Sequence, residues 1–185
     1  GGIINSAEAL TAWFNPTINS YKRINAPVTA SGATWAPNTI TYSGNNRTHM
    51  IRVPGPGRFE LRLMDGATNP YLLQAGILAA GIDGIENKRN PGKPINVNMY
   101  EDGHKVKGAK KLPLTLEKAL SHLDKSKVLK NAFSKETINS YIMLKNKEIK
   151  KYNSSNVKKI GFKGSKQNSK KNAITQWEKD NTLDC

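Results

Sequence analysis

Apolar residues recur at helical spacing in several parts of the chain, and this pattern predicts three amphipathic helices. In residues 1–13 (GGIINSAEALTAW) the pattern resembles the tail of a helix that starts upstream, and Asn15 and Pro16 stop it. The other two segments each begin with a residue that can cap a helix: 115–123 with Thr115, and 134–150 with Ser134.

A fourth predicted helix, residues 70–87, is apolar on nearly all sides. Thr68 or Asn69 can cap it, and Pro70 suits the first helical position. A helix that is apolar all round is typically buried, so we expect this one to lie inside the protein. Several small residues would let its neighbours approach closely: Gly76, Ala79, Ala80, Gly81 and Gly84.

Two short strands are expected at residues 47–53 and 58–63, on either side of the turn sequence PGPG. Side chains alternate between the faces of a strand. The second strand should therefore have a charged front and an apolar, covered back. The front carries Arg58, Glu60 and Arg62, and the back carries Phe59, Leu61 and Leu63.

Other stretches are less regular. Residues 24–44 are rich in Pro, Gly, Thr and Ser and predict a long loop with one strand near 39–42, kept in order by Trp35 and Tyr42. Residues 153–172 are a Lys/Ser/Asn-rich stretch that we expect to be mobile. We divide the chain into a main part (1–152), this insertion (153–172) and a C-terminal segment held by Trp177 (173–185).

Charge raises nucleic acid or an anionic membrane as a partner, because the 185 residues carry a net charge of +15. However, the chain contains no nucleic-acid-binding motif, and its lysines are not interleaved with aromatic residues. A nonspecific nucleic-acid-binding protein therefore stays an alternative from a different functional class. No apolar run reaches the roughly 18–20 residues of a membrane span. The single cysteine, Cys185, favours a reducing, cytoplasmic setting.

The candidate chemistry lies around Glu60. No acidic residue occurs between Glu8 and Glu60, whereas the same span holds five fixed cations: Lys22, Arg23, Arg47, Arg52 and Arg58. Arginine binds carboxylates and phosphates through two parallel hydrogen bonds, so the pattern predicts a site for a multiply anionic ligand. Glu60 could also hold a divalent metal together with phosphates.

Two simpler interpretations stay open. Glu60 could pair with Arg58 or Arg62 as a surface ion pair of little energetic value. His49 is a lone histidine, for which a structural or substrate-orienting role is expected more often than a metal-binding one.

Three segments resemble the C-terminal part of the catalytic domain of glutamine synthetases. They are NPTINSYKR, GNNRTHMIRVP and RFELRLMDGATNPYLLQAGILAAGIDGIENK, in the family's order and spacing. The likeness covers about residues 1–152, with a weaker echo at 177–185. It implies an α+β fold in which antiparallel strands form one wall of a half-barrel packed on helices.

The resemblance also implies an ATP-dependent ligase. Such an enzyme phosphorylates the γ-carboxylate of glutamate and then lets ammonia or an amine displace the phosphate. The implied cofactors are ATP and two or three divalent metals, Mg²⁺ or Mn²⁺. The implied assembly is a homo-oligomeric ring of ten or twelve subunits, with small molecules as substrates and no specific nucleic acid or membrane partner.

Individual roles follow from the positions that match the family's motifs. Arg23 and Arg62 match arginines that hold glutamate or its phosphorylated form. Glu60 matches a metal ligand that bridges to the nucleotide. The remaining three match arginines on the phosphates of ATP, of which Arg47 and Arg58 are also expected to be catalytic: Arg47, Arg52 and Arg58.

The chain departs from the family after Arg23. Ordinary members continue with a flap that carries a glutamate, which helps to take a proton from ammonium. Here the sequence continues INAPVTASGATWAPN, which contains no acid. This spelling is similar to a divergent branch that includes γ-glutamylmethylamide synthetase. We therefore hypothesise that the site admits an alkylamine such as methylamine.

Further expectations concern what the chain lacks. The family's small N-terminal domain, its upstream metal ligands and its adenine-binding segment have no counterpart here, so we expect the 185 residues alone to be inactive as a ligase. A catalytically dead relative is a third alternative, which the retained arginines and Glu60 disfavour. Tyr100 stands where some relatives carry an adenylylated tyrosine, but its context favours an ordinary loop residue.

Overall fold

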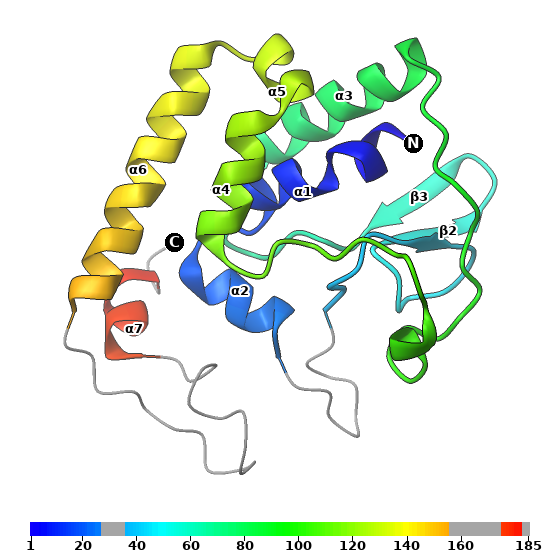
Figure 1. The fold of residues 1–185 in the computed structure, drawn as a ribbon, viewed down its shortest axis with the longest axis horizontal. Helices are drawn as coiled ribbons and strands as arrows, with labels where there is room; N and C mark the ends of the chain where they lie inside the picture. The colour runs from blue at the N-terminus through cyan, green and yellow to red at the C-terminus, as the bar shows by residue number, and fades with distance from the viewer. Residues whose placement is uncertain (27–35, 156–174, 183–185) are drawn as a thin grey trace.

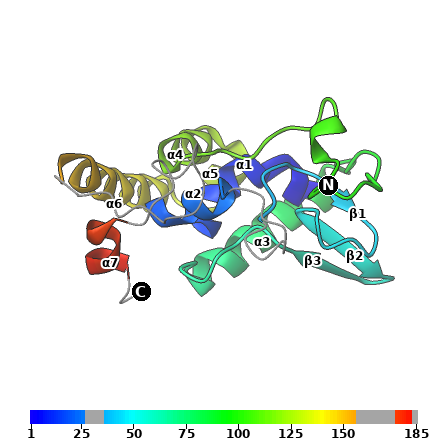
Figure 2. The same cartoon turned by 90° about the horizontal axis from the view of Figure 1, so that it is seen from below.

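The computed structural model describes residues 1–26, 36–155 and 175–182. Helices gather at one end of an elongated body and a small sheet lies at the other (Figures 1 and 2). The predicted α+β class is confirmed. The elements in chain order are α1 (Gly2–Phe14), α2 (Ile18–Ile24), β1 (Tyr42–Ser43), β2 (Ile51–Gly55), β3 (Arg58–Leu61), α3 (Pro70–Glu86), a 3-10 turn (Gly103–Lys105), α4 (Leu116–Lys125), α5 (Lys127–Ala132), α6 (Lys135–Ser154) and α7 (Gln176–Thr182).

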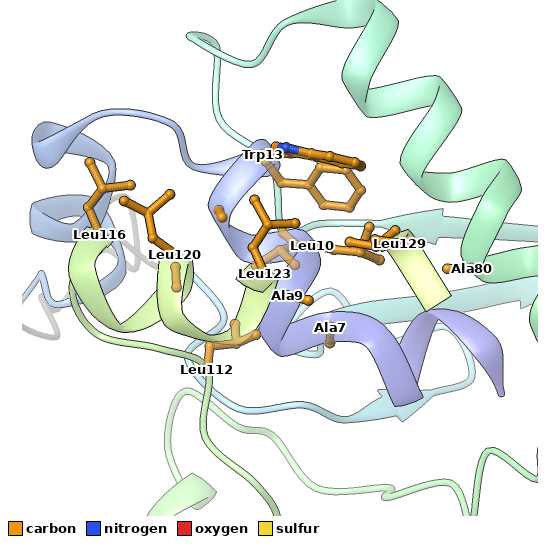
Figure 3. Close-up of a cluster of buried hydrophobic side chains, with 14 of the residues drawn as sticks. Ala7, Ala9, Leu10, Trp13, Ala80, Leu112, Leu116, Leu120, Leu123 and Leu129 are labelled. Carbon is orange, nitrogen blue, oxygen red and sulfur yellow. The ribbon is translucent and has the colours of Figure 1, made fainter. Parts of the chain in front are cut away.

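Helix α1 forms the centre of the core, with α3 on one side and α4 on the other (Figures 1 and 3). Leu10 and Trp13 are almost fully buried and meet leucines of α4 such as Leu120 and Leu123. The Trp13 ring packs edge-on against Phe133, with ring centroids 4.9 Å apart. The predicted first helix is therefore confirmed, and ten of its thirteen residues are buried.

The expectation that the fourth predicted helix is buried was wrong. Helix α3 begins at the predicted place, where the Asn69 side chain caps it by accepting from the backbone N–H groups of Tyr71 and Leu72. Only one side, which includes Gly76 and Ala80, is buried, and it faces α1. The opposite side is open in the described part of the chain, since Ile85 is 78% exposed.

Close approach explains some of the small residues in α3. A Cβ added at Gly84 would lie 2.8 Å from the Cα of Gly2 on α1, and one at Gly76 would lie 3.0 Å from the Leu10 side chain. By contrast, a Cβ at Gly81 would meet nothing within 4 Å among the described residues. The prediction of close packing therefore holds at Gly76 and Gly84 and fails at Gly81.

The sheet has the order β1-β2-β3, with β1 parallel to β2 and β2 antiparallel to β3. The expected antiparallel pairing of the two strands around the PGPG turn is confirmed, and β1 adds a parallel neighbour whose direction was not predicted. The strand predicted near residues 39–42 forms as β1 at Tyr42–Ser43, while Thr39 makes only an isolated bridge to Lys111. The strand predicted from residue 47 begins only at Ile51.

A local turn explains the late start of β2. The Asn46 side chain accepts hydrogen bonds from the backbone N–H and the hydroxyl of Thr48, at 2.9 and 2.7 Å. Such side-chain contacts compete with strand pairing, so Arg47 lies in a turn instead of in a strand. The expected apolar back of β3 is covered only in part, because Leu63 is fully buried and Phe59 is 50% exposed.

Of the remaining helices, α4 and α6 were predicted from the sequence, whereas α2 and α7 were not predicted as helices. Thr115 and Ser134 cap α4 and α6 as predicted, whereas α5, capped by Ser126, was not predicted. Trp177 lies on α7 and packs edge-on against Tyr152 of α6, with ring centroids 5.3 Å apart. The expected mobility of 153–172 and the expected order at Trp35 concern residues largely outside the described ranges, which resume at 175.

Candidate functional site

The site begins with an ion pair between neighbouring strands. Arg52 on β2 lies opposite Glu60 on β3 in the register of the sheet, and its Nη1 donates to both Glu60 carboxylate oxygens at 2.8 Å. The Asn45 side-chain oxygen accepts from the other side of the guanidinium, with Nε at 2.9 Å. Arg52 is 9% exposed. This double contact therefore fixes both the arginine and the carboxylate.

Neither simple pairing predicted for Glu60 gives its main partner. The cross-strand Arg52 takes that place, and Arg58 stands farther away, with Nη2 at 3.9 Å from Glu60 Oε1. The Arg58 side chain is 68% exposed, and Arg47 is exposed in the turn before β2. The structure thus gathers one fixed and two exposed arginines around a single carboxylate.

These arginines keep Glu60 ionised. The hydrogen bonds from Arg52 hold the pKa of Glu60 below its ordinary value, and the charges of Arg52, Arg58 and Arg47 add to this effect. An ionised carboxylate accepts at about four positions, of which Arg52 uses two. Glu60 could therefore offer an oxygen to a cation. No group of three or more His, Cys, Asp or Glu side chains placed to hold a metal occurs among residues 1–26, 36–155 and 175–182.

A second part of the site lies where β3 ends. Arg23, in the last turn of α2, donates from Nη2 to the Asn15 side-chain oxygen at 2.7 Å and to the Leu63 carbonyl at 2.8 Å. The Asn15 amide donates to the same carbonyl at 3.1 Å. Burial lowers the pKa of Arg23, and the charge of Asp65 opposes that shift. The chain segment before α2 and the end of β3 thus hold the guanidinium from both sides.

Arg62 precedes the carbonyl that Arg23 contacts, and its backbone N–H continues the sheet by donating to the Met50 carbonyl at 2.8 Å. The Nε atoms of Arg23 and Arg62 are both buried, and neither has a hydrogen-bond partner within the described part of the chain. Unpaired buried donors cost free energy, which a ligand with acceptor oxygens would recover.

His49 has a structural position. Its Nδ1 lies 3.0 Å from the Thr41 hydroxyl, its Nε2 lies 2.9 Å from the Val97 carbonyl, and its side chain is fully buried. Burial lowers its pKa, so the ring is neutral at neutral pH. These contacts tie the loop after α3 to the strands, in line with the structural role that was one of the two expected.

Sequence reasoning missed the residues that hold the arginines in place. Asn45 and Asn15 each accept from a guanidinium, yet asparagine beside Gly or Pro ordinarily indicates a turn. The nearest sequence signal was their place inside the segments GNNR and NPTINSYKR.

Tyr100 lies in a turn, where its backbone N–H donates to the Asn98 side chain at 3.1 Å.

Comparison with known protein families shows which family the chain belongs to. Residues 1–163 match the family described as "Glutamine synthetase, catalytic domain". The chain belongs to the glutamine synthetase family.

No helix in the described ranges combines the length and apolar character that crossing a membrane requires.

Two kinds of family member are similar to the chain. It is 53% identical over 184 residues to a glutamine synthetase of Rhizobium leguminosarum bv. phaseoli, and 44% identical over 154 residues to a glutamate–methylamine ligase of Methyloversatilis universalis. These alignments cover 100% and 82% of the chain, but only 38% and 34% of the relatives. The chain therefore spans little more than a third of their length.

Solved structures give the same family. The structure described as "GmaS/ADP complex-Conformation 1" superposes with a TM-score of 0.78 at 48% identity, and "Apo GmaS without ligand" with 0.75 at 44%. Both cover the whole chain, and the chain covers 38% and 37% of them. These structural likenesses agree with the family match at residues 1–163.

Proposed function

We propose that this chain supplies one wall of the active site of an ATP-dependent ligase that makes a γ-glutamyl amide. A γ-carboxylate oxygen of glutamate attacks the γ-phosphorus of ATP, and the bond to the bridging oxygen breaks to release ADP. The nitrogen of ammonia or an amine then attacks the γ-carbonyl carbon, phosphate leaves, and the nitrogen loses a proton. Similarity to curated ligases of this family supports the proposal.

The observation that carries the proposal is the pair of buried Nε–H groups on Arg23 and Arg62, for which residues 1–26, 36–155 and 175–182 provide no hydrogen-bond partner. A carboxylate is the natural partner for two guanidinium groups, because it accepts bidentate hydrogen bonds. We assign these two residues to the glutamyl group. Asn15 and the Leu63 carbonyl set the orientation of Arg23 before substrate arrives.

The other half of the site suits phosphates. Arg58 and Arg47 are exposed and can turn toward anionic oxygens, while Arg52 is fixed by Asn45 and Glu60. Phosphoryl transfer depends mainly on positioning and on neutralising charge that spreads over phosphate oxygens. We assign Arg47, Arg52 and Arg58 to the nucleotide phosphates, with Arg47 and Arg58 also stabilising the transferring group.

Glu60 fits one ligand position of a divalent cation. Mg²⁺ is commonly held by one or two carboxylates, phosphate oxygens and water, and Glu60 is ionised and 37% exposed. Such a cation, Mg²⁺ or Mn²⁺, would offset phosphate charge when bound. A nucleotide cofactor agrees with the similar structure that is described as an ADP complex.

A second candidate acceptor is methylamine. The glutamate–methylamine ligase is among the similar relatives, and residues 24–38 contain no acidic side chain. A carboxylate beside the acceptor would favour a cationic ammonium, so its absence from this stretch would relax that selection. Residues 27–35 of this stretch lie outside the residues that the structure describes.

The setting of the whole enzyme is part of the same proposal. We assign it to the cytoplasm, as a homo-oligomeric ring of ten or twelve copies that uses only small-molecule substrates. Mass measurement of the intact assembly by light scattering tests the ring.

Nonspecific nucleic-acid binding, suggested by the charge of +15, predicts retention on heparin that modest salt removes.

The function is tested in a chimaeric ligase, in which this chain replaces the matching 184-residue segment of the R. leguminosarum enzyme. The proposal predicts a γ-glutamyl amide and one ADP per amide formed. The Glu60→Gln variant should abolish turnover without unfolding the protein. A folded chimaera that forms no amide with ammonium or methylamine would refute the proposal, as would full activity of Glu60→Gln.

A further inference from the structure

Helix α2 carries two neighbouring cations that reach opposite parts of the molecule. Arg23 points to Asn15 and the end of β3, whereas the Lys22 ammonium forms an ion pair with the Glu178 carboxylate of α7. Consecutive residues of a helix lie about 100° apart around its axis, so one helix can make both contacts. Because Lys22 and Arg23 are consecutive residues in the last turn of α2, a movement of one side chain's attachment point moves that of the other.

The ion pair is almost completely removed from water. The Lys22 side chain is 12% exposed and that of Glu178 is 1% exposed. The same Glu178 oxygen accepts from the Thr175 backbone N–H at 2.6 Å and from its hydroxyl at 2.8 Å. In return, the Thr175 hydroxyl accepts from the Glu178 N–H at 3.3 Å, which completes a capping box at the start of α7.

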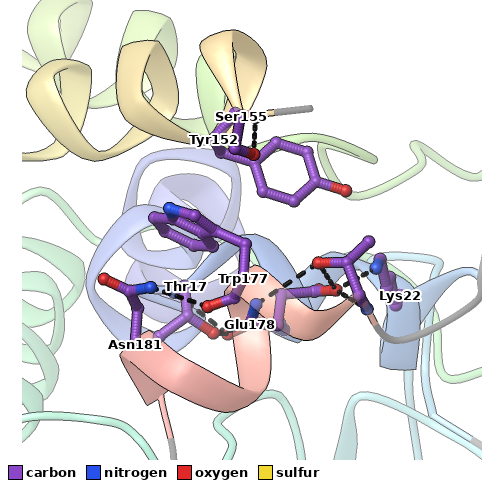
Figure 4. A network of polar contacts seen from close by, with 9 residues as sticks. Thr17, Lys22, Tyr152, Ser155, Trp177, Glu178 and Asn181 are labelled. Atoms are coloured by element: carbon purple, nitrogen blue, oxygen red, sulfur yellow. Dashed lines mark hydrogen bonds and ion pairs between the residues drawn. The ribbon is translucent and has the colours of Figure 1, made fainter. Parts of the chain in front are cut away.

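Helix α6 contributes to the same contact (Figure 4). The Tyr152 ring packs edge-on against Trp177. The Lys22 Nζ lies 5.9 Å from the centroid of the Tyr152 ring. Burial and the Glu178 carboxylate raise the pKa of the Tyr152 hydroxyl. Lys22 therefore reaches a site built from two helices that lie more than a hundred residues away in the sequence.

The contact is better suited to setting orientation than to adding stability. A buried ion pair gains little over an apolar contact of the same size, but removing one partner leaves an uncompensated charge. Among the described residues of α7, the buried side chain is that of Glu178, whereas Gln176, Lys179 and Asp180 are exposed. Helix α7 is thus positioned chiefly through polar groups and the Trp177 ring.

We propose that Glu178 is a positioning residue, which acts through Lys22 to hold α2 so that Arg23 faces the glutamyl group. This rests on the proposed function, because it gives the C-terminal helix a part in substrate affinity. Losing the pair should let α2 tilt and weaken glutamate binding, while ATP, assigned to the β2–β3 arginines, should bind as before. The effect on the Michaelis constant for glutamate should be about tenfold, typical of coupling between two sites.

Four single variants and one double variant separate this role from general destabilisation. Glu178→Gln and Lys22→Met each remove one charge, and Lys22→Arg keeps the charge. Asp180→Asn is the matched control, since Asp180 is an exposed acid on the same helix that accepts from Gln176 at 2.7 Å. The double variant Lys22→Met with Glu178→Gln should be no worse than either single change, because both remove the same interaction.

Two measurements on the full 185-residue chain do not need activity. Hydrogen exchange at the α2 amides should rise about tenfold in Glu178→Gln and Lys22→Met, with no change at α4. The NMR signal of the Arg23 Nε–H should move in the same two variants. Neither should change in Asp180→Asn, and Lys22→Arg should stay close to the wild type.

The chimaeric ligase then gives the kinetic result. Glu178→Gln should raise the KM for glutamate and leave the KM for ATP unchanged. The proposal is overturned if α2 exchange and the Arg23 signal do not respond, or if they respond while the KM for glutamate stays constant. A wild-type chimaera without activity would instead refute the proposed function, and exchange and NMR would still decide whether Glu178 positions Arg23.

Discussion

Arg52 and Glu60 face each other across the antiparallel strands β2 and β3, with one guanidinium nitrogen 2.8 Å from both carboxylate oxygens. The contact joins a largely buried cation to a carboxylate that reaches the surface. It accounts for the ionised state of Glu60 and, together with Asn45, for the fixed position of the Arg52 side chain. Substitutions at this pair should therefore affect catalysis more than folding.

Replacing Arg52 with Met should lower kcat of the chimaeric ligase by about a hundredfold, the usual cost of losing one preorganised charge stabiliser. Glu60 would lose the nitrogen that donates to both of its oxygens, and Asn45 would lose the donor it accepts from. The matched control is Arg89→Met, which breaks an ion pair with Asp83 away from the site. Equal losses of kcat in the two variants, at equal thermal stability, would contradict the assigned role.

Arg23→Lys and Arg62→Lys should each raise the KM for glutamate about tenfold. Lysine keeps the charge but lacks the planar fork, whose Nε–H has no hydrogen-bond partner among the described residues in either arginine. Arg58→Lys provides the comparison, since it should lower kcat and leave the KM for glutamate nearly unchanged. Initial rates at varied glutamate and saturating ATP measure both constants. An unchanged KM in both Arg23→Lys and Arg62→Lys would remove these residues from the glutamyl site.

His49 predicts how stability depends on pH. Its folded-state pKa lies below the ordinary value of 6.5, so the unfolded chain takes up a proton at a higher pH than the folded one. The free energy of unfolding should therefore be highest above pH 6.5 and fall as the pH drops from 6.5 toward the lowered folded-state value. Urea unfolding at several pH values measures this slope.

His49→Gln should remove that slope, and also lower stability at every pH, because the buried contacts to Thr41 and Val97 are disturbed. His122→Gln is the control, since His122 is 42% exposed and stands 3.8 Å from Glu8. If His122→Gln flattens the slope and His49→Gln does not, the assignment of the pH dependence to His49 is wrong.

The choice of amine should depend little on charge recognition. The absence of acids from residues 24–38 predicts that the chimaeric ligase accepts methylamine in addition to ammonium, without a strong preference for ammonium when the two are compared as kcat/KM. The unmodified R. leguminosarum enzyme serves as the reference. A strong preference of the chimaera for ammonium would defeat the alkylamine hypothesis and leave the proposed ligase reaction intact.

Local patterns predicted local structure well. Asn69 and Pro70 marked the start of α3 correctly, and Thr115 and Ser134 marked those of α4 and α6. These signals work because a cap uses backbone groups a few residues away. The burial of α3 was predicted wrongly. An apolar helix surface shows that covering it would be favourable, but it does not show whether the described residues cover it.

Long-range pairs could not be predicted. Alternation placed Glu60 on the face of Arg58 and Arg62, but its main partner, Arg52, follows from the register of a second strand. A bulge between Arg52 and Gly55 shifts that register, and the sequence does not reveal it. Lys22 and Glu178 are still farther apart in the sequence, and the short C-terminal segment 173–185 gave no indication of a buried ion pair.

Formation of γ-glutamyl phosphate at this site is the central claim, and positional isotope exchange tests it most directly. ATP labelled at the oxygen that bridges the β and γ phosphorus atoms is incubated with the chimaeric ligase and glutamate, without any amine. Reversible phosphoryl transfer predicts that the label moves to a non-bridging position of the β-phosphate, only when glutamate is present. Arg62→Lys should slow this exchange. Amide formation by the wild-type chimaera without any glutamate-dependent exchange would contradict the account.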